Sequence, residues 1–258
     1  MIIYFTGTGN SGFVASRLST LMNERLTRID RKFYDNPEVT LADGERLIWI
    51  FPIYSWGVPP VVKSVIERID GVPTGTPTWM VATCGDDAGY ADRTFDKLVG
   101  ARGMKPMGAF TVQMPNTYVT MAGFDIDPEP KALGKIEHAP KRIAEIAALI
   151  LKGTPATDVI RGSFPWLKTR VVYPWFMRYQ VAPRHFNVDN RCVCCGKCAD
   201  SCPLSNISME AGRPAWGDTC AFCLNCYHVC PTHAIDWKHT AARKGQYSLA
   251  TLIKKLRR

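Results

Sequence analysis

The stretch IIYFTGTGNSG, residues 2–12, passes without a break from an apolar run into a loop of glycine, hydroxyl and amide side chains. The apolar run predicts a buried strand, and the glycines predict a tight turn before the first helix. Free backbone N–H groups at a helix N-terminus can bind an anion. No lysine follows the glycines, as a Walker loop requires, so the sequence predicts a phosphate loop that works without a cation.

The residues that follow alternate between strand-like and helix-like patterns. Five apolar runs have the length of strands: 2–5, 26–29, 46–51, 78–82 and 107–113. Near-continuous apolar strands are typical of a parallel sheet that is covered on both faces. We therefore expect residues 1–153 to form a doubly wound α/β domain with a five-stranded parallel sheet.

Three further loops follow predicted strands and would lie at the same edge of this sheet. FPIYSWGVPP (51–60) ends the third strand, TCGDDAGY (83–90) ends the fourth, and MPNTYV (114–119) follows the fifth. In a doubly wound sheet, ligands bind where the carboxyl ends of the strands meet at the switch point. The sequence therefore predicts one binding site at this edge, and Asn116, Thr117 and Tyr118 are candidates to contribute to it.

Two ligands fit the first loop. Read as G-x-G-x-x-G from Gly7 to Gly12, it matches the dinucleotide fingerprint, with Asp30 near the position that would bind a ribose. Its pattern T-G-T-G-N-S resembles instead the phosphate loop of flavodoxins, which bind FMN. The loops at 51–60 and 83–90 also resemble the flavodoxin loops that cover and contact the flavin ring, which favours flavin over NAD. The resemblance implies an FMN site formed by Thr6, Gly7, Thr8, Gly9, Asn10, Ser11, Tyr54, Ser55, Trp56, Gly57, Thr83, Cys84, Gly85, Asp86 and Tyr90.

Two of these residues have alternative roles. Tyr90 lies one position further along the chain than the stacking tyrosine of flavodoxins, and Tyr54 competes with it for contact with the ring. Asp86 could cap the following helix instead of facing the flavin. The structural alternative for the first loop as a whole is a glycine-rich turn with capping hydroxyls.

Cysteines are concentrated in a second region. Nine of the ten lie between Cys192 and Cys230, and only Cys84 precedes them. Disulfides staple a whole fold, whereas metal ligands cluster, so the pattern favours a metal site. Eight of the nine form two copies of C-x2-C-x2-C-x3-C-P at an offset of 28 residues. Zinc is the alternative, but it would use only four of these cysteines and would explain neither proline.

This spacing resembles that of bacterial ferredoxins with two [4Fe–4S] clusters. The resemblance implies a smaller α+β domain at residues 187–240. In that family the fourth cysteine of each motif reaches the other cluster, which implies two ligand sets: Cys192, Cys195, Cys198 and Cys230, and Cys220, Cys223, Cys226 and Cys202. Cys194 belongs to neither copy, and we expect it to lie beside a cluster without binding it.

Charge and aromatic residues gather in two other segments. Residues 154–186 are aromatic, basic and interrupted by prolines, which predicts an irregular connector buried at the seam between the domains, with contact to a membrane surface as the alternative. Residues 241–258 carry six bases and no acid, which predicts a solvated basic tail. Binding to an acidic redox partner or to a membrane surface is the alternative role of the tail.

Composition sets the broad class. The chain has 258 residues, a net charge of +9, no apolar run long enough to span a membrane and no secretory leader at its start, so we expect a cytoplasmic protein. No helix-turn-helix or RNA-binding pattern is recognisable, which disfavours a partner nucleic acid and a regulatory role.

Together the two regions resemble fused flavodoxin–ferredoxin proteins of anaerobes. The resemblance implies an electron-transfer iron–sulfur flavoprotein with FMN, two [4Fe–4S] clusters and an external redox partner. An FMN-dependent reductase of a small molecule is the alternative. The sequence identifies no catalytic residue, although Tyr54 or Tyr118 could donate a proton.

Overall fold

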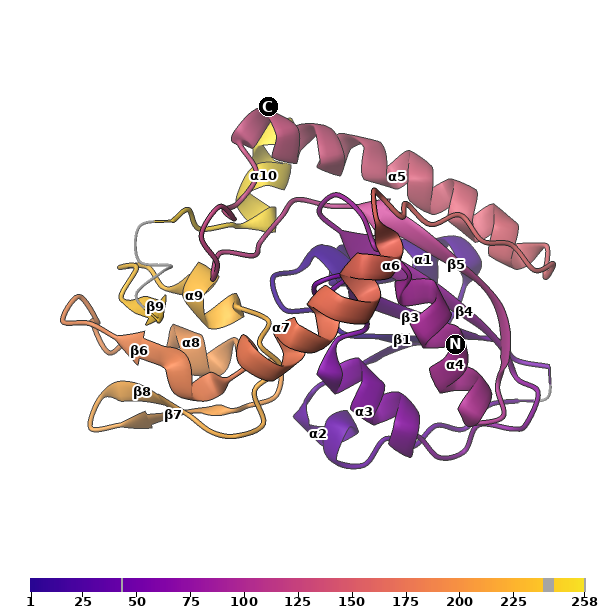
Figure 1. The fold of residues 1–258 in the computed structure, drawn as a ribbon, viewed down its shortest axis with the longest axis horizontal. Helices are drawn as coiled ribbons and strands as arrows, with labels where there is room; N and C mark the ends of the chain where they lie inside the picture. Colours follow the sequence, from indigo (N-terminus) through magenta and orange to yellow (C-terminus); the bar gives the residue numbers. More distant parts are fainter. Residues whose placement is uncertain (43, 239–243, 258) are drawn as a thin grey trace.

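The structure is a computed structural model that describes residues 1–42, 44–238 and 244–257. Its larger part is a sheet of five strands: β1 (Ile2–Tyr4), β2 (Leu26–Arg28), β3 (Leu47–Pro52), β4 (Pro77–Cys84) and β5 (Lys105–Gln113) (Figure 1). They lie in the order β2-β1-β3-β4-β5, and all neighbouring strands are parallel. This is the flavodoxin-like strand order, so the predicted fold class is confirmed.

Helices cover both faces of this sheet: α1 (Asn10–Met22), α2 (Arg31–Asp35), α3 (Pro60–Arg68), α4 (Ala91–Ala101) and α5 (Glu129–Leu151). Successive residues of a strand point to opposite faces. Ile2 therefore belongs to the core beneath α1 and α5, whereas Ile3 belongs to the core beneath α3 and α4. The winding direction reverses between β1 and β3, so the loops after these two strands open toward one crevice.

A smaller domain contains short elements only: β6 (Phe186–Val188), α8 (Lys197–Asp200), β7 (Ile207–Glu210), β8 (Arg213–Trp216), α9 (Asn225–Val229) and β9 (Ile235–Trp237). β6 pairs with β9 and β7 with β8, both antiparallel. The cysteine repeat is also a structural repeat, since equivalent positions share a left-handed backbone. Gly196 (φ 73°) corresponds to Leu224 (φ 61°), and Cys194 (φ 53°) corresponds to Phe222 (φ 51°). Cys194 thus occupies the place of an aromatic residue in the other copy.

The segment between the domains is helical, which corrects the prediction of an irregular connector. α6 (Pro165–Leu167), the π-helical turns η1 (Lys168–Val172) and α7 (Tyr173–Tyr179) follow one another without a gap, before the 3-10 turn η2 (Pro183–His185). The prediction failed because proline was expected to break the helix. Pro174 lies in the first turn of α7, where its missing N–H costs little, and the register change to π turns comes directly before it.

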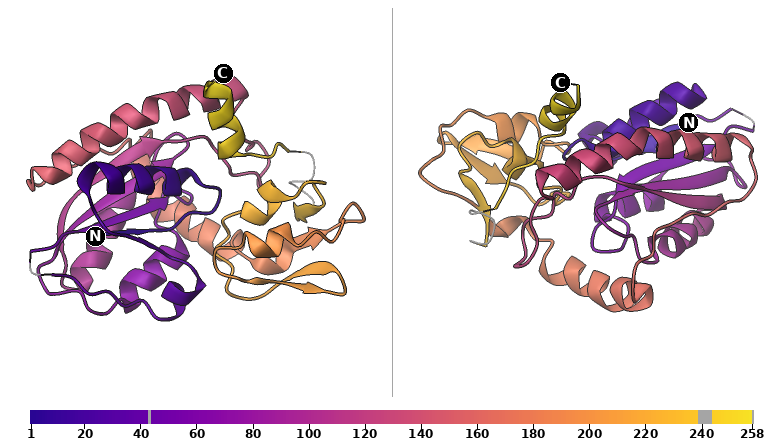
Figure 2. Two further views of the ribbon diagram at one scale, coloured as in Figure 1. Left: turned by 180° about the vertical axis from the view of Figure 1, so that it is seen from behind. Right: turned by 90° about the horizontal axis from the view of Figure 1, so that it is seen from above.

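The C-terminal segment is not a solvated tail either. The predicted boundary at residues 240 and 241 lies outside the described residues, but α10 (Leu249–Leu256) packs on α5. Its residues Leu249, Leu252 and Ile253 join the core beneath α1 and α5. Figure 2 shows α10 beside the first turns of α5, and Lys255 of α10 pairs with Glu129, the first residue of α5. These apolar residues recur at helical spacing and lie on one face of α10. Burial of that face against the core stabilises the packed helix even though the segment is strongly basic. No helix among the described residues combines the length and apolar character needed to cross a membrane.

Candidate functional site

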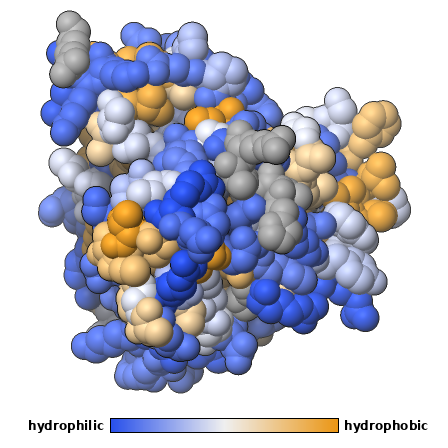
Figure 3. Space-filling view, turned by 90° about the vertical axis from the view of Figure 1, so that its left-hand side faces the viewer, coloured by the Kyte–Doolittle hydropathy of each residue, from blue (hydrophilic) through white to orange (hydrophobic). Residues whose placement is uncertain are grey.

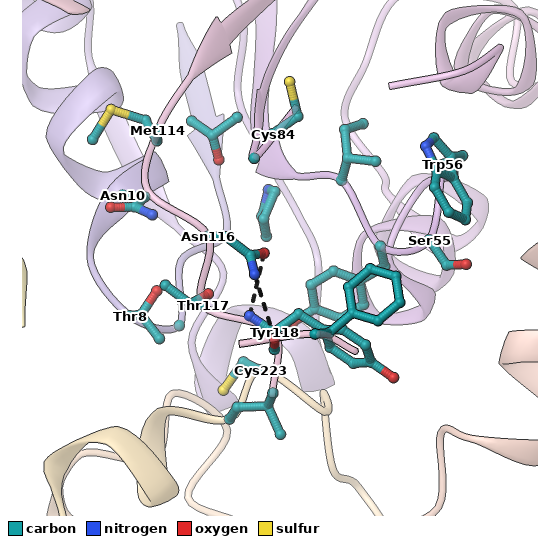
Figure 4. Close-up of a pocket in the computed structure, with 18 of the residues that line it drawn as sticks. Thr8, Asn10, Ser55, Trp56, Cys84, Met114, Asn116, Thr117, Tyr118 and Cys223 are labelled. Atoms are coloured by element: carbon teal, nitrogen blue, oxygen red, sulfur yellow. Dashed lines mark hydrogen bonds between the residues drawn. The ribbon is translucent and has the colours of Figure 1, made fainter. Parts of the chain in front are cut away.

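A cavity of about 450 Å³ lies at the carboxyl edge of the sheet. The loops after β1, β3, β4 and β5 surround it (Figure 4). Phe222, Cys223 and Leu224 of the small domain close one side of the cavity, and Val172, Trp175 and Phe176 of the connector close another. Most of the site residues predicted from the sequence line this cavity: Thr6, Gly7, Thr8, Asn10, Ser11, Tyr54, Ser55, Trp56, Thr83, Cys84, Gly85, Asp86, Asn116, Thr117 and Tyr118.

The loop after β1 presents unused donors to this cavity. Within the described part of the chain, the backbone N–H groups of residues 7–10 have no hydrogen-bond acceptor. The hydroxyl of Thr6 is buried and also lacks a partner there. Ser11 is held against Thr83 by a 2.7 Å contact between their hydroxyls, and Gly9 caps α1 with φ 102°. Because these donors converge at the N-terminus of a 13-residue helix, the loop fits a phosphate group.

The loop after β3 places Trp56 at the opposite end of the cavity (Figure 4). Tyr54 and Gly57 exchange backbone hydrogen bonds of 3.1 and 3.0 Å around a two-residue turn. The two central residues, Ser55 (φ 44°) and Trp56 (φ 65°), are both left-handed, as a type I′ turn requires. Two non-glycine residues at positive φ are strained, and such strain is found at binding sites where the surroundings hold it.

The connector holds this turn in place. The hydroxyl of Thr169 donates to the carbonyl of Trp56 at 3.0 Å and accepts the N–H of Tyr90 at 2.9 Å. The hydroxyl of Tyr173 donates to the carbonyl of Val58 at 2.6 Å. A Cβ built on Gly57 would lie 2.4 Å from the Tyr173 ring, so only glycine fits beneath it. Hydrogen bonds and packing from the connector therefore hold the loop at residues 51–60, which was predicted to cover a flavin ring.

Two predicted flavin contacts lie elsewhere than expected. Tyr90 does not line the cavity, because its ring is taken up by the guanidinium of Arg93, 3.8 Å from the ring centroid. Asp86 borders the cavity but is exposed and forms an ion pair with Lys131 at 3.0 Å. It is not the cap of α4 either, since α4 has no side-chain cap. Gly9 and Gly57 shape their loops without lining the cavity.

Tyr54 points a polar atom into an apolar setting. Its hydroxyl is buried and has no hydrogen-bond partner in the described residues. Burial, together with the nearby thiols of Cys223 and Cys220, raises the pKa of Tyr54 well above its usual value. The group therefore stays protonated and can donate one hydrogen bond to a molecule in the cavity.

Each predicted cysteine set surrounds its own small cavity. One cavity is lined by Cys192, Cys195, Cys198 and Cys230, and the other by Cys202, Cys220, Cys223 and Cys226. The fourth cysteine of each motif has crossed to the other set, as the ferredoxin pattern implies. In the described residues no three such side chains are close enough to hold a single metal ion, and the thiols instead ring a space between them. The arrangement fits two cubane clusters.

The surroundings of the thiols repeat as well. The sulfur of Cys202 accepts a hydrogen bond from the backbone N–H of Asn206, and the sulfur of Cys230 accepts one from Ala234. In both, the N–S distance is 3.3 Å and the donor lies four residues after the cysteine. Burial raises the pKa of Cys220 to about 11 and that of Cys223 to about 12. Buried thiols of this kind become thiolates only with a positive centre beside them, so metal binding and ionisation are coupled.

A strap from the C-terminal segment joins the two domains at the large cavity. The buried hydroxyl of Tyr247 donates a hydrogen bond to the side-chain oxygen of Asn10 at 2.5 Å. The backbone N–H of Tyr247 donates to Nδ1 of His228 at 3.0 Å. The other ring nitrogen of His228 lies 2.8 Å from the carbonyl of Thr117. Sequence reasoning missed Tyr247, His228 and Thr169, because lone residues outside a motif carry no spacing signal.

Comparisons with known proteins find a curated relative for one part of the chain. No protein-family model matches it. A 46-residue part is 37% identical to a ferredoxin of Methanothermococcus thermolithotrophicus, covering 17% of this chain and 77% of that protein.

Among solved structures, the chain is similar to a flavodoxin of Streptococcus pneumoniae TIGR4 (13% identity, TM-score 0.37, 59% of this chain and 97% of that one). It is also similar to a short-chain flavodoxin associated with a bacterial microcompartment (17% identity, TM-score 0.36, covering 59% of this chain and 95% of that one). The strand order, rather than these low scores, assigns the fold.

Proposed function

Through its cysteine-rich segment the chain belongs to the ferredoxin family, and we propose that it is an electron-transfer iron–sulfur flavoprotein. In this proposal the large cavity binds FMN, the two cysteine sets hold two [4Fe–4S] clusters, and an external redox protein exchanges electrons with them. The clusters supply one-electron chemistry and FMN supplies both one- and two-electron chemistry when bound.

One observation carries the proposal. Cys223 lines the second cysteine cavity and also the large cavity beside the phosphate loop. Leu224 lines both cavities too, whereas none of the described residues that line the first cysteine cavity lines the large one. The residues therefore support a series in which the second cysteine set lies between the first set and the flavin site.

The first cysteine set is the better contact for an external protein. Cys195 is exposed and its neighbour Val193 is 61% exposed, whereas Cys223 is enclosed between the domains. Figure 3 shows the side of the molecule that bears the small domain's strands β6, β8 and β9, and this side is largely hydrophilic with scattered apolar patches. The chain's net charge of +9 supports a partner with an acidic surface. We expect such a pair in the cytoplasm of an anaerobic cell.

Cofactor content is the direct test. Protein purified without oxygen is expected to contain about eight iron, eight sulfide and one FMN per chain. Bound zinc without sulfide, or a nicotinamide dinucleotide in place of FMN, would contradict the assignment. Electron transfer is tested by mixing the holoprotein with a reduced low-potential ferredoxin and following flavin bleaching. A Cys195→Ala variant should bleach at least about tenfold more slowly with unchanged flavin content.

A reductase is the second candidate, and the free hydroxyl of Tyr54 favours it. This hydroxyl can donate a hydrogen bond that polarises a small-molecule substrate in the cavity, which a reductase needs and a carrier does not. Turnover with quinone and nitroaromatic acceptors separates the two functions. If the protein is a reductase, Tyr54→Phe lowers kcat with little change in KM, whereas a carrier shows equal flavin bleaching in variant and parent chain.

A further inference from the structure

The connector helix exposes an apolar face to solvent. This outer face consists of Phe164, Trp166, Leu167, Val171, Trp175 and Tyr179, which are 44–77% exposed. Leu167, Val171, Trp175 and Tyr179 recur every four residues, so they share one side of the α6–η1–α7 segment, and Phe164 and Trp166 lie beside them at its start. Figure 2 shows this segment as a separate ridge on the side of the molecule away from α10.

The protein holds this face outward. Thr169 and Tyr173 bind the loops of the sheet domain through the hydrogen bonds described above, and Phe176, only 4% exposed, belongs to the core of the small domain. These three anchors lie on the opposite side of the helix, so the outer face cannot turn inward without breaking them. An exposed, contiguous apolar patch of this kind marks an interaction site.

The segment that bears the outer face carries charges of one sign only. Residues 161–185 contain five Lys and Arg and no Asp or Glu. Lys168 and Arg161 are used internally, in ion pairs with Asp87 and Asp92. Arg170 and Arg178, on the helix, have no ion pair among the described residues, and both are exposed. The partner of this face is therefore expected to be anionic.

We propose that the outer face docks the protein on an anionic membrane surface. Aromatic side chains beside arginines on a helix with an opposite anchored face are typical of interfacial helices. Apart from Trp175, the residues of the outer face line none of the three cavities described above, which suits insertion into the headgroup region better than binding of a peptide in a groove. Val172, Trp175 and Phe176 also line the large cavity, so docking would bring that cavity close to the lipid surface. The inference does not depend on which cofactor the cavity holds.

Vesicle co-sedimentation of the full-length holoprotein tests this inference. We expect binding to vesicles of phosphatidylglycerol and phosphatidylcholine, and binding at least about tenfold weaker to phosphatidylcholine alone. Arg170→Gln/Arg178→Gln should weaken binding roughly 20-fold, because each arginine near an anionic surface strengthens it about fivefold. Lys254→Gln on α10 combined with Arg257→Gln at its C-cap makes the same change of net charge on the other side of the molecule and should leave binding unchanged.

The apolar contribution has its own pair of variants. Trp166→Ser/Leu167→Ser should lower binding by at least about 30-fold, while Leu21→Ser/Leu151→Ser, at similarly exposed positions elsewhere, should not. Circular dichroism and flavin content verify that each variant is folded. Absence of vesicle binding by the parent chain overturns the proposal, as does equal loss in the control variants. A concentration-dependent dimer that Trp166→Ser/Leu167→Ser abolishes, without vesicle binding, would assign the face to a second copy of the chain instead.

Discussion

Gly7 of the phosphate loop and Cys223 of the second cysteine set lie in direct contact: a Cβ atom built on Gly7 would be 2.5 Å from the Cβ of Cys223 and 3.1 Å from its sulfur. A residue of the sheet domain that lines the large cavity thus touches a residue that lines a cysteine cavity. This contact makes the two sites neighbours even though their residues are more than two hundred positions apart in the chain.

Gly7→Ala is expected to separate the two sites. The added methyl group overlaps the Cys223 side chain and carbonyl, so the loop that bears Cys223 or the phosphate loop must move. We expect flavin affinity to fall at least about tenfold and the second cysteine set to lose iron more readily on exposure to air. Flavin titration and iron assay measure both. Gly134→Ala in α5, where a Cβ meets nothing within 4 Å, is the control and should change neither.

Cysteine variants should separate the two cysteine sets. Cys195→Ala is expected to leave about four iron atoms per chain and full flavin content, because its cavity shares no residue with the large one. Cys223→Ala should also cost about four iron atoms but should weaken flavin binding as well. Cys194→Ala keeps all the iron if Cys194 is only the counterpart of Phe222. Joint loss of flavin in Cys195→Ala would contradict the separation of the sites.

The strap from Tyr247 to Asn10 predicts a link between the C-terminal segment and flavin binding. Tyr247→Phe leaves the side-chain oxygen of Asn10 buried without its donor, which costs about 1–2 kcal/mol. We expect a lower unfolding temperature and weaker flavin binding. Tyr179→Phe removes a hydroxyl from an exposed tyrosine and serves as the matched control. Equal flavin affinity in parent and Tyr247→Phe would show that the strap is independent of the site.

Asp96 predicts a pH dependence of stability. Burial, followed by the carboxylate of Asp92, raises the pKa of Asp96 to about 6. In the unfolded chain the Asp96 carboxyl ionises near pH 4. Because its pKa is higher in the folded protein, its contribution to stability is fully present below about pH 4 and is lost as the pH rises through about 6. Asp96→Asn should therefore raise stability at pH 7.5, by about 1 kcal/mol for a half-exposed group, and by less at pH 5. Thermal unfolding of the holoprotein at both pH values measures the change, and Asp218→Asn, at an exposed position, should show none.

Repeating local patterns made much of the fold predictable. The five apolar runs became the five strands, within two residues at either end. For β1, β3 and β4 the reason is burial, because a buried parallel strand needs continuous apolar residues, whereas two of the three residues of the edge strand β2 are exposed. The connector was predicted wrongly because Pro174 was taken as a helix breaker, while its place in the first turn of α7 depends on where the preceding π turns end. The C-terminal segment was predicted wrongly because its charge is visible in the sequence and the core that receives Leu249 is not.

The cysteine sets and a phosphate loop could be predicted from the chain alone, because both predictions depend on spacing along a few residues and not on how the rest of the chain packs. Three contacts could be seen only in the folded chain: Cys223 lies against Gly7, Tyr247 reaches Asn10, and Tyr90 stacks with Arg93 and does not line the cavity. Each of these depends on how two distant surfaces fit together. No local pattern encodes such a fit, because packing selects it from shape, charge and burial over the whole chain.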